Sequence, residues 1–304
     1  MTHPLVSVAI PAYNHAAYIE ACLNSVCAQT YPELELVLID DGSRDDTFEI
    51  AKRFLAEHAG RFRRIVLERQ ENKGVSATSN ACIVACQGEW VHLLGSDDVL
   101  YPEKITRIQQ AIEDWHCPDL VLVHADVHII DPEGQRHARQ SKKARPAAGV
   151  DRKAWYWLFM GRHYIFNPTL ALRRDAFFSV GGFDPNLVLE DMDFWLRLSV
   201  GYAFGRVPEV LAGYRKHPAN ASRRRVSMLA AQFQTYAKFL SSHGSLIPEK
   251  DLQRHFRTQL KRFWRRTRKR RPWLLPLVIA AWAKSYLKTP LSEDYRQIGA
   301  LLGR

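Results

Sequence analysis

The first hundred residues alternate between short apolar runs and longer segments with helical spacing of apolar residues, and this alternation constrains the fold of the 304-residue chain most. Apolar runs predict strands and a 3.6-residue period predicts helices. The expected strands are Val6–Ile10, Leu34–Asp40, Arg63–Gln70 and Trp90–Leu94, and the expected helices are Ala16–Gln29, Thr47–Gly60, Val75–Cys86 and Pro102–Trp115. Strands and helices that alternate with short connections predict a mostly parallel, Rossmann-like α/β sheet flanked by helices.

The pattern changes further along the chain. Strand-like runs recur at Asp119–Asp131, Pro168–Arg174 and Val210–His217, whereas the polar segment 132–150 predicts a loop. From Val226 onward the spacing predicts only helices. We therefore expect an α/β domain over residues 1–222 and a helical C-terminal region over residues 223–304.

Two simple features bear on location and redox chemistry. The start, MTHPLVSVAI, lacks a basic segment followed by a long apolar one, so we expect a cytoplasmic protein without a secretory signal. The five cysteines include no CxxC pair, which favours packed thiols over disulfides or a zinc site.

Polar residues follow each of the four expected parallel strands. They form the segments PAYN (11–14), DDGSRDD (40–46), ENKG (71–74) and GSDD (95–98). Open α/β sheets bind their ligands at the carboxyl ends of the strands. These four loops are therefore the expected site.

The adjacent acids Asp97 and Asp98 point to a cation. Neighbouring carboxylates repel each other, and no basic residue stands beside this pair in the sequence. Mg²⁺ or Mn²⁺ takes one or two carboxylates and completes its shell with phosphate oxygens and water. We expect a divalent ion at this strand end.

The chain resembles glycosyltransferase family 2, whose members have a GT-A fold. The resemblance lies in VSVAIPAYN through DDGSRDDT, in ENKGVSATSN through GSDDVLYP, in LEDMDFWLRL and in LAGYRKH, and it covers about residues 5–222 in order. It implies a metal-dependent, inverting glycosyltransferase that moves a sugar from a nucleotide-diphosphate donor, with UDP as the expected nucleotide, to a hydroxyl group. Residues 1–131 would bind the nucleotide sugar and residues 132–222 the acceptor, a glycan or lipid-linked precursor of bacterial surface polysaccharide or lipopolysaccharide.

The resemblance implies nucleotide-binding roles at the first two strand ends. These roles fall on Pro11, Tyr13, Asn14, Asp40 and Asp41. The Tyr13 ring would pack against the base, and either Asp40 or Asp41 would accept a hydrogen bond from a uracil N–H.

The resemblance also implies a metal and phosphate site. Asp97 matches the last acid of the family's Asp-x-Asp motif and is the expected metal ligand, while Asp98 would contact ribose, sugar or metal. His217 is a further candidate ligand of the metal or a phosphate, and Arg215 is a candidate contact of the diphosphate. These positions would hold Mn²⁺ or Mg²⁺.

Two positions depart from the family pattern. Gly95 stands where the motif often has its first Asp, so we expect weaker metal affinity when no nucleotide is present. Ser79 stands where the family often carries Arg. A cationic phosphate contact is then missing, and Lys73 is the expected substitute.

The acids of LEDMD are candidates for the general base that accepts the proton of the acceptor hydroxyl. Helical spacing puts Glu190 and Asp193 on one face and Asp191 on another. The resemblance assigns the base to Asp191 and leaves Glu190 as a candidate phosphate or acceptor contact. Helix capping is the alternative role of these acids.

A basic tail accounts for most of the net charge of +11, because Leu252–Arg271 contains ten Lys or Arg and no acid. The following apolar run, Trp273–Ala283, is eleven residues long, whereas a bilayer span needs about 20. We expect peripheral attachment to the anionic inner face of the plasma membrane, which a lipid-linked acceptor would explain. The alternatives are nucleic-acid binding, which we do not favour, and a solvated basic helix packed on the catalytic domain.

Two other functions remain open on the sequence. A nucleotidyltransferase can use a related sheet, and a protein that only binds a nucleotide sugar or nucleic acid can carry a similar fold. The set Asp97, Asp98 and Asp191 favours an enzyme over a binding protein.

Overall fold

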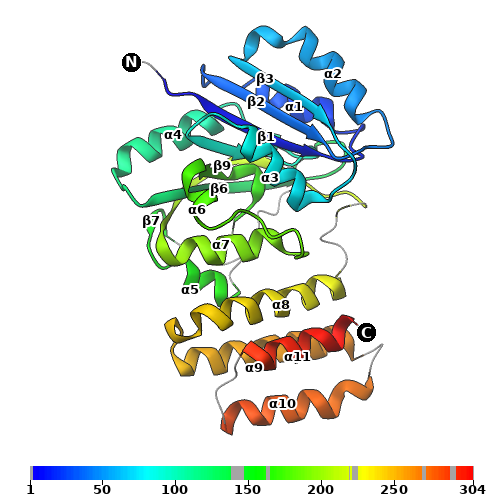
Figure 1. Cartoon of the computed structure of the whole chain (residues 1–304), viewed down its shortest axis with the longest axis vertical. Helices are drawn as coiled ribbons and strands as arrows, with labels where there is room; N and C mark the ends of the chain where they lie inside the picture. The colour runs from blue at the N-terminus through cyan, green and yellow to red at the C-terminus, as the bar shows by residue number, and fades with distance from the viewer. Residues whose placement is uncertain are drawn as a thin grey trace.

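Figure 1 shows the computed structural model of the chain, which describes residues 3–137, 147–161, 165–218, 220, 225–268, 272–287 and 292–303. Its centre is a nine-stranded sheet with the order β3-β2-β1-β4-β8-β6-β9-β5, in which β7 pairs with β9. The last four helices form a stack at one end of the molecule, away from the edge formed by β1, β2 and β3.

The first half of the sheet is parallel and confirms the predicted alternation. Its strands are β1 (Val6–Ala12), β2 (Leu34–Asp40), β3 (Arg64–Arg69) and β4 (Trp90–Leu93), and its helices are α1 (Ile19–Cys27), α2 (Thr47–Glu57), α3 (Val75–Ala85) and α4 (Lys104–Trp115). Ala9 of β1 is paired with Val37 of β2 and with Leu93 of β4. This register brings the ends of β1, β2 and β4 to one edge of the sheet.

The second half of the sheet is mixed. The strands β5 (Val99–Leu100), β6 (Leu120–Ile130), β7 (Gly149–Asp151), β8 (Ala171–Arg173) and β9 (Ala203–Arg215) complete it. The short β8 lies between β4 and β6 and is antiparallel to both. β6 and β9 are parallel over most of their length. The expected strand from Pro168 is shorter than predicted, because Asn167–Thr169 forms a 3₁₀ turn.

Separate apolar cores cover the two faces of the parallel half. Val8 and Leu36 pack with Ile19 and Phe54 of α1 and α2, whereas Val37 packs toward α3 in a second core. The five cysteines are free thiols, three of them buried.

The second core continues into the C-terminal helices. These are α5 (Ala154–Phe159), α6 (Arg174–Ser179), α7 (Glu190–Gly201), α8 (Arg225–His243), α9 (Glu249–Thr267), α10 (Leu275–Leu287) and α11 (Ser292–Gly303). Phe159 of α5 packs against Tyr236 of α8 and His255 of α9. Residues 221–224, where we expect the domain boundary, lie outside the described ranges, so the proposed division stays a prediction.

The tail is helical, as predicted. α9 buries Phe256, Leu260 and Phe263 on one face and exposes basic side chains on the other. Lys269, Arg270 and Arg271 of the basic cluster lie outside the described residues. Within the described ranges, no helix combines the length and apolar character that a membrane crossing requires.

Candidate active site

A cavity of about 570 Å³ opens where β1, β2 and β4 end, and it also reaches the start of α7 and the end of β9. It is lined by most of the residues that the sequence singled out. These are Pro11, Tyr13, Asn14, Asp41, Asp97, Glu190, Asp191 and His217. The candidates that are not among the lining residues are Asp40, Lys73, Asp98, Asp193 and Arg215.

The loop after β1 is fastened to the loop after β2. The Asn14 N–H donates to Ser43 Oγ at 2.9 Å, and Asn14 Oδ1 accepts the Arg44 N–H at 2.8 Å. The Tyr13 side chain beside them is 40% exposed. A phenol ring on a braced loop at the cavity wall suits contact with a flat base.

Asp40 and Asp41 have different surroundings although they are adjacent. Asp40 is fully buried and accepts the Ser43 N–H at 2.9 Å, which closes the turn after β2. Asp41 lies at the cavity and accepts the backbone N–H groups of Lys73 at 2.8 Å and Gly74 at 2.9 Å. It also accepts Gln70 Nε2 at 2.8 Å. Among the described residues, Asp41 thus accepts three hydrogen bonds, of the about four that a carboxylate group can accept.

The side chain of Lys73 is exposed and is not part of the cavity wall. Its backbone N–H holds Asp41, as described above. Ser79 of α3 does line the cavity and is almost fully buried. The cavity wall therefore presents the Ser79 hydroxyl group at this position. The Lys73 side chain, which was expected to replace the missing cation, is not part of that wall.

The two adjacent acids of the GSDD segment, Asp97 and Asp98, have different surroundings. Asp97 Oδ2 lies 2.9 Å from His217 Nε2 and accepts Asn220 Nδ2 at 3.2 Å, at the cavity wall. Asp98 is 3% exposed, and its Oδ1 accepts the Arg215 backbone N–H at 2.7 Å. Burial, with a smaller contribution from Asp97, raises the pKa of Asp98 well above its ordinary value. Asp98 thus joins the loop to β9 and does not line the cavity.

Arg215 at the end of β9 is buried, and its guanidinium is occupied by backbone carbonyls. Nε donates to the Asp97 carbonyl at 2.7 Å, and Nη1 donates to the carbonyls of Asp131 at 3.0 Å and Pro132 at 2.7 Å. The group also lies 5.0 Å from the centre of the Tyr18 ring. Arg215 therefore fixes the backbone at Asp97, and it is not among the residues that line the cavity.

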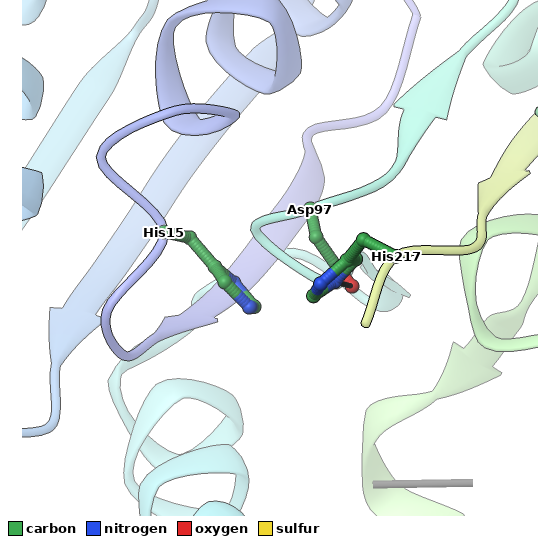
Figure 2. Close-up of side chains that lie close together, drawn as sticks. All are labelled: His15, Asp97 and His217. Carbon is green, nitrogen blue, oxygen red and sulfur yellow. Dashed lines mark hydrogen bonds and ion pairs between the residues drawn. The ribbon is translucent and has the colours of Figure 1, made fainter. Parts of the chain in front are cut away.

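His15 is a site residue that the sequence reasoning missed. It directly follows Tyr13-Asn14, and its Nδ1 lies 2.7 Å from Ser96 Oγ. Figure 2 shows it beside Asp97 and His217, and the ligand-type atoms of the three residues lie within 4.8 Å of one another. Burial lowers the pKa of His15, with Asp97 opposing this effect. The only available signal was a histidine in a loop already assigned to the site.

The three acids at the start of α7 lie in two different environments. Glu190 and Asp191 both line the cavity, whereas Asp193 is buried and bonded to Arg197 Nε at 2.8 Å and Lys238 Nζ at 3.1 Å. Glu190, the first residue of the helix, therefore shares the cavity with Asp191 and not with Asp193. Asp193 fastens α7 to α8 and so orients the two acids at the helix start.

Burial shifts both cavity acids toward their protonated forms. It is the largest cause that raises the pKa of Glu190 to about 8, and the neighbouring Asp191 adds to it. Burial also raises the pKa of Asp191, against a hydrogen bond from the Met192 N–H at 2.6 Å. Two adjacent carboxyls whose ionised forms burial disfavours can hold and exchange a proton between them.

The cavity at the carboxyl edge of the sheet has acids on two walls and a His-Asp-His group that could hold a metal ion, and this arrangement fits a glycosyltransferase that uses a nucleotide sugar. Residues 7–180 match glycosyl transferase family 2, and the chain belongs to this family. The alternatives of a nucleotidyltransferase and a non-catalytic binding protein are thereby set aside.

Individual relatives agree with this assignment. The chain is 38% identical over 199 residues to a PGL/p-HBAD biosynthesis glycosyltransferase of Mycobacterium bovis, covering 65% of this chain and 70% of the relative. Its fold matches that of S. aureus TarS 1–349 in complex with UDP, with a TM-score of 0.64 at 19% identity over 99% of this chain and 92% of that 1–349 chain. It also matches the mannosyltransferase PcManGT from Pyrobaculum calidifontis in complex with GDP-Man and Mn²⁺, with a TM-score of 0.56 at 18% identity over 99% and 85% of the chains.

Proposed function

We propose that the protein is a divalent-metal-dependent, inverting glycosyltransferase that moves a sugar from a UDP-linked donor to a hydroxyl group of a lipid-linked or surface-polysaccharide acceptor. The observation that carries this proposal is the composition of one cavity. It is lined by Tyr13 and Asp41, which are the proposed nucleotide contacts, by the Asp97–His217 pair and by the carboxyl pair Glu190 and Asp191.

The residues that would hold Mn²⁺ or Mg²⁺ are Asp97 and His217. Their oxygen and nitrogen lie 2.9 Å apart, and a carboxylate and an imidazole are both ordinary ligands of divalent ions. A bound ion would supply Lewis-acid stabilisation of the charge on the departing diphosphate. Arg215 supports the Asp97 side of this pair through its bond to the Asp97 carbonyl, and Asp98 joins the same loop to β9.

Asp191 is the proposed base. It would take the proton of the acceptor hydroxyl while that oxygen attacks the anomeric carbon, in a single displacement that inverts the anomeric configuration. Glu190 beside it would carry a proton near neutral pH and donate a hydrogen bond to the acceptor or a phosphate oxygen.

The test is a product assay on the purified chain. A panel of UDP- and GDP-sugars is incubated with Mn²⁺ or Mg²⁺ and with lipid-linked saccharide acceptors, and the released nucleotide and the glycoside are identified. Transfer with release of a free nucleoside diphosphate and an inverted anomeric centre is expected. A retained configuration, or full activity in chelator without metal, would contradict the proposal.

Attachment to the anionic inner face of the plasma membrane is part of the proposal. The outermost helix α10 and the turn before it expose the large apolar side chains Trp273 (67%), Leu275 (38%), Leu277 (50%), Ile279 (54%) and Trp282 (38%). Exposed large apolar side chains in such number along one segment are typical of surfaces that contact a membrane or another protein. Arg265 and Arg268 are exposed near the end of the preceding helix α9, and each basic residue near an anionic surface contributes about 1 kcal/mol.

Flotation with lipid vesicles tests the attachment. Wild-type protein is expected to float with vesicles that contain anionic lipid, and a Trp273→Ser, Leu277→Ser double variant is expected to stay in the soluble fraction. Exposed Val84→Ser on α3 is the matched control. Equal flotation with neutral and anionic vesicles, or self-association that the double variant abolishes, would oppose the membrane assignment.

A further inference from the structure

Three side chains that can bind a metal ion meet at one part of the cavity, although they come from loops far apart in the sequence. His15 follows β1, Asp97 follows β4 and His217 follows β9 (Figure 2). One ligand-type atom of each lies within 4.8 Å of those of the other two. The rings of His15 and His217 stand at 90° with their centres 5.6 Å apart.

His15 is held in this position from two sides. Its backbone N–H donates to Thr47 Oγ1 at 2.8 Å, and its Nδ1 lies 2.7 Å from Ser96 Oγ. When Nδ1 donates to the serine hydroxyl, Nε2 keeps the lone pair that an ion requires. Metal-binding histidines commonly have their second ring nitrogen fixed by a hydrogen bond of this kind.

Gly95 makes room for the arrangement. A Cβ atom at this position would lie 2.9 Å from Asp97 Oδ1 and 3.3 Å from Asp98 Oδ2. An acid at position 95 would therefore displace the carboxylate that now faces His217. The glycine removes one oxygen ligand of the Asp-x-Asp pattern, and the imidazole of His15 stands where a further ligand can reach the same ion.

We propose that His15 is a third protein ligand, and that the resulting His-Asp-His site binds a transition-metal dication such as Mn²⁺ in preference to Mg²⁺, even before a nucleotide is present. The inference rests on the proposed function, since it concerns the same ion. Imidazole nitrogens suit transition metals, whereas Mg²⁺ prefers oxygen ligands. Three protein ligands also reduce the need for diphosphate oxygens, contrary to the weak nucleotide-free affinity expected from Gly95 alone.

The experiment is a metal titration of the full chain, freed of metal with chelator and kept without nucleotide or sugar. Free Mn²⁺ is followed by electron paramagnetic resonance, and Co²⁺ binding by visible absorption. Wild-type protein is expected to bind both ions, and a hundredfold excess of Mg²⁺ is expected to leave most of the Mn²⁺ bound.

The variants separate His15 from its neighbours. His15→Ala is expected to weaken Mn²⁺ binding by more than the about 10–100-fold that loss of an outer partner of a metal ligand typically costs. Ser96→Ala should give a smaller loss, because it removes only the group that orients the ring. His3→Ala, at an exposed histidine outside the cavity, should bind as wild type. Thermal unfolding verifies that each variant is folded.

Mn²⁺ affinity that is unchanged in folded His15→Ala would overturn the inference, and so would equal competition by Mg²⁺ or no binding without nucleotide. These outcomes differ from failure of the proposed function. A protein that binds Mn²⁺ through His15 but transfers no sugar would refute the function and keep the site, whereas a metal-dependent transferase indifferent to His15 would do the reverse.

Discussion

Asp191→Asn removes the charge and basicity of the proposed base while it keeps the size of the side chain. The variant should fold normally, because an asparagine Oδ1 can still accept the Met192 N–H that Asp191 accepts at 2.6 Å. A positioned general base contributes about 10²–10⁴-fold to a rate, so kcat should fall by about that factor. Donor affinity should persist, because Tyr13 and Asp41 come from other loops.

The pH dependence gives a second readout of the same variant. Burial raises the pKa of Asp191, so lowering the pH protonates the base and the wild-type rate should fall on the acidic side. With a pKa of about 8, Glu190 carries its proton in most molecules at pH 7. The rate of Glu190→Gln should therefore still fall at low pH, whereas the residual rate of Asp191→Asn should no longer show this fall.

The assay is steady-state transfer from a UDP-sugar between pH 5 and 9, with donor affinity measured separately by calorimetry. Asp175→Asn is the matched control, since Asp175 is a helix-start acid whose side chain is 71% exposed and lies outside the cavity. A folded Asp191→Asn enzyme that retains more than about a tenth of wild-type kcat, against the hundredfold minimum expected of a base, would refute the assignment.

Two further predictions concern stability. Lys104 is fully buried against His92 and the Leu170 carbonyl, and burial lowers its pKa well below 10.5. The unfolded chain therefore binds more protons than the folded one, so the free energy of unfolding should rise with pH toward 10.5, by at most about 1.4 kcal/mol per pH unit from this group. Urea unfolding at several pH values measures this slope, and Lys104→Met should remove the part that Lys104 contributes. A slope that is unchanged in Lys104→Met would contradict the burial of a neutral amine. Gly205→Ala would put a Cβ atom 2.2 Å from the Trp115 ring and should lower the free energy of unfolding by about 1–3 kcal/mol. The control is Gly201→Ala, whose added Cβ meets nothing within 4 Å and should cost less. Equal losses in the two variants would argue against the Trp115 contact.

The sequence allowed the α/β alternation and the position of the site to be predicted because both depend on local patterns. The apolar period of α1 and α2 is set by residues three or four apart, and polar loops after apolar strands mark the carboxyl edge of a parallel sheet. The candidate metal ligands Asp97 and His217 followed from motif resemblance, and the structure places them 2.9 Å apart. The β7 strand (Gly149–Asp151) was missed, and its start lies in the segment predicted as a loop, because three residues carry little periodic signal.

Only the tertiary structure decides which acids line the cavity and which are buried behind it. Asp97 and Asp98 are chemically alike in the sequence, yet one faces His217, 120 residues away, and the other is buried against the Arg215 backbone, 117 residues away. His15 became part of the site because β1 lies next to β4, which brings their following loops together. Sequence patterns report on neighbours along the chain, whereas burial, ion pairs and ligand geometry depend on which strands and helices pack together.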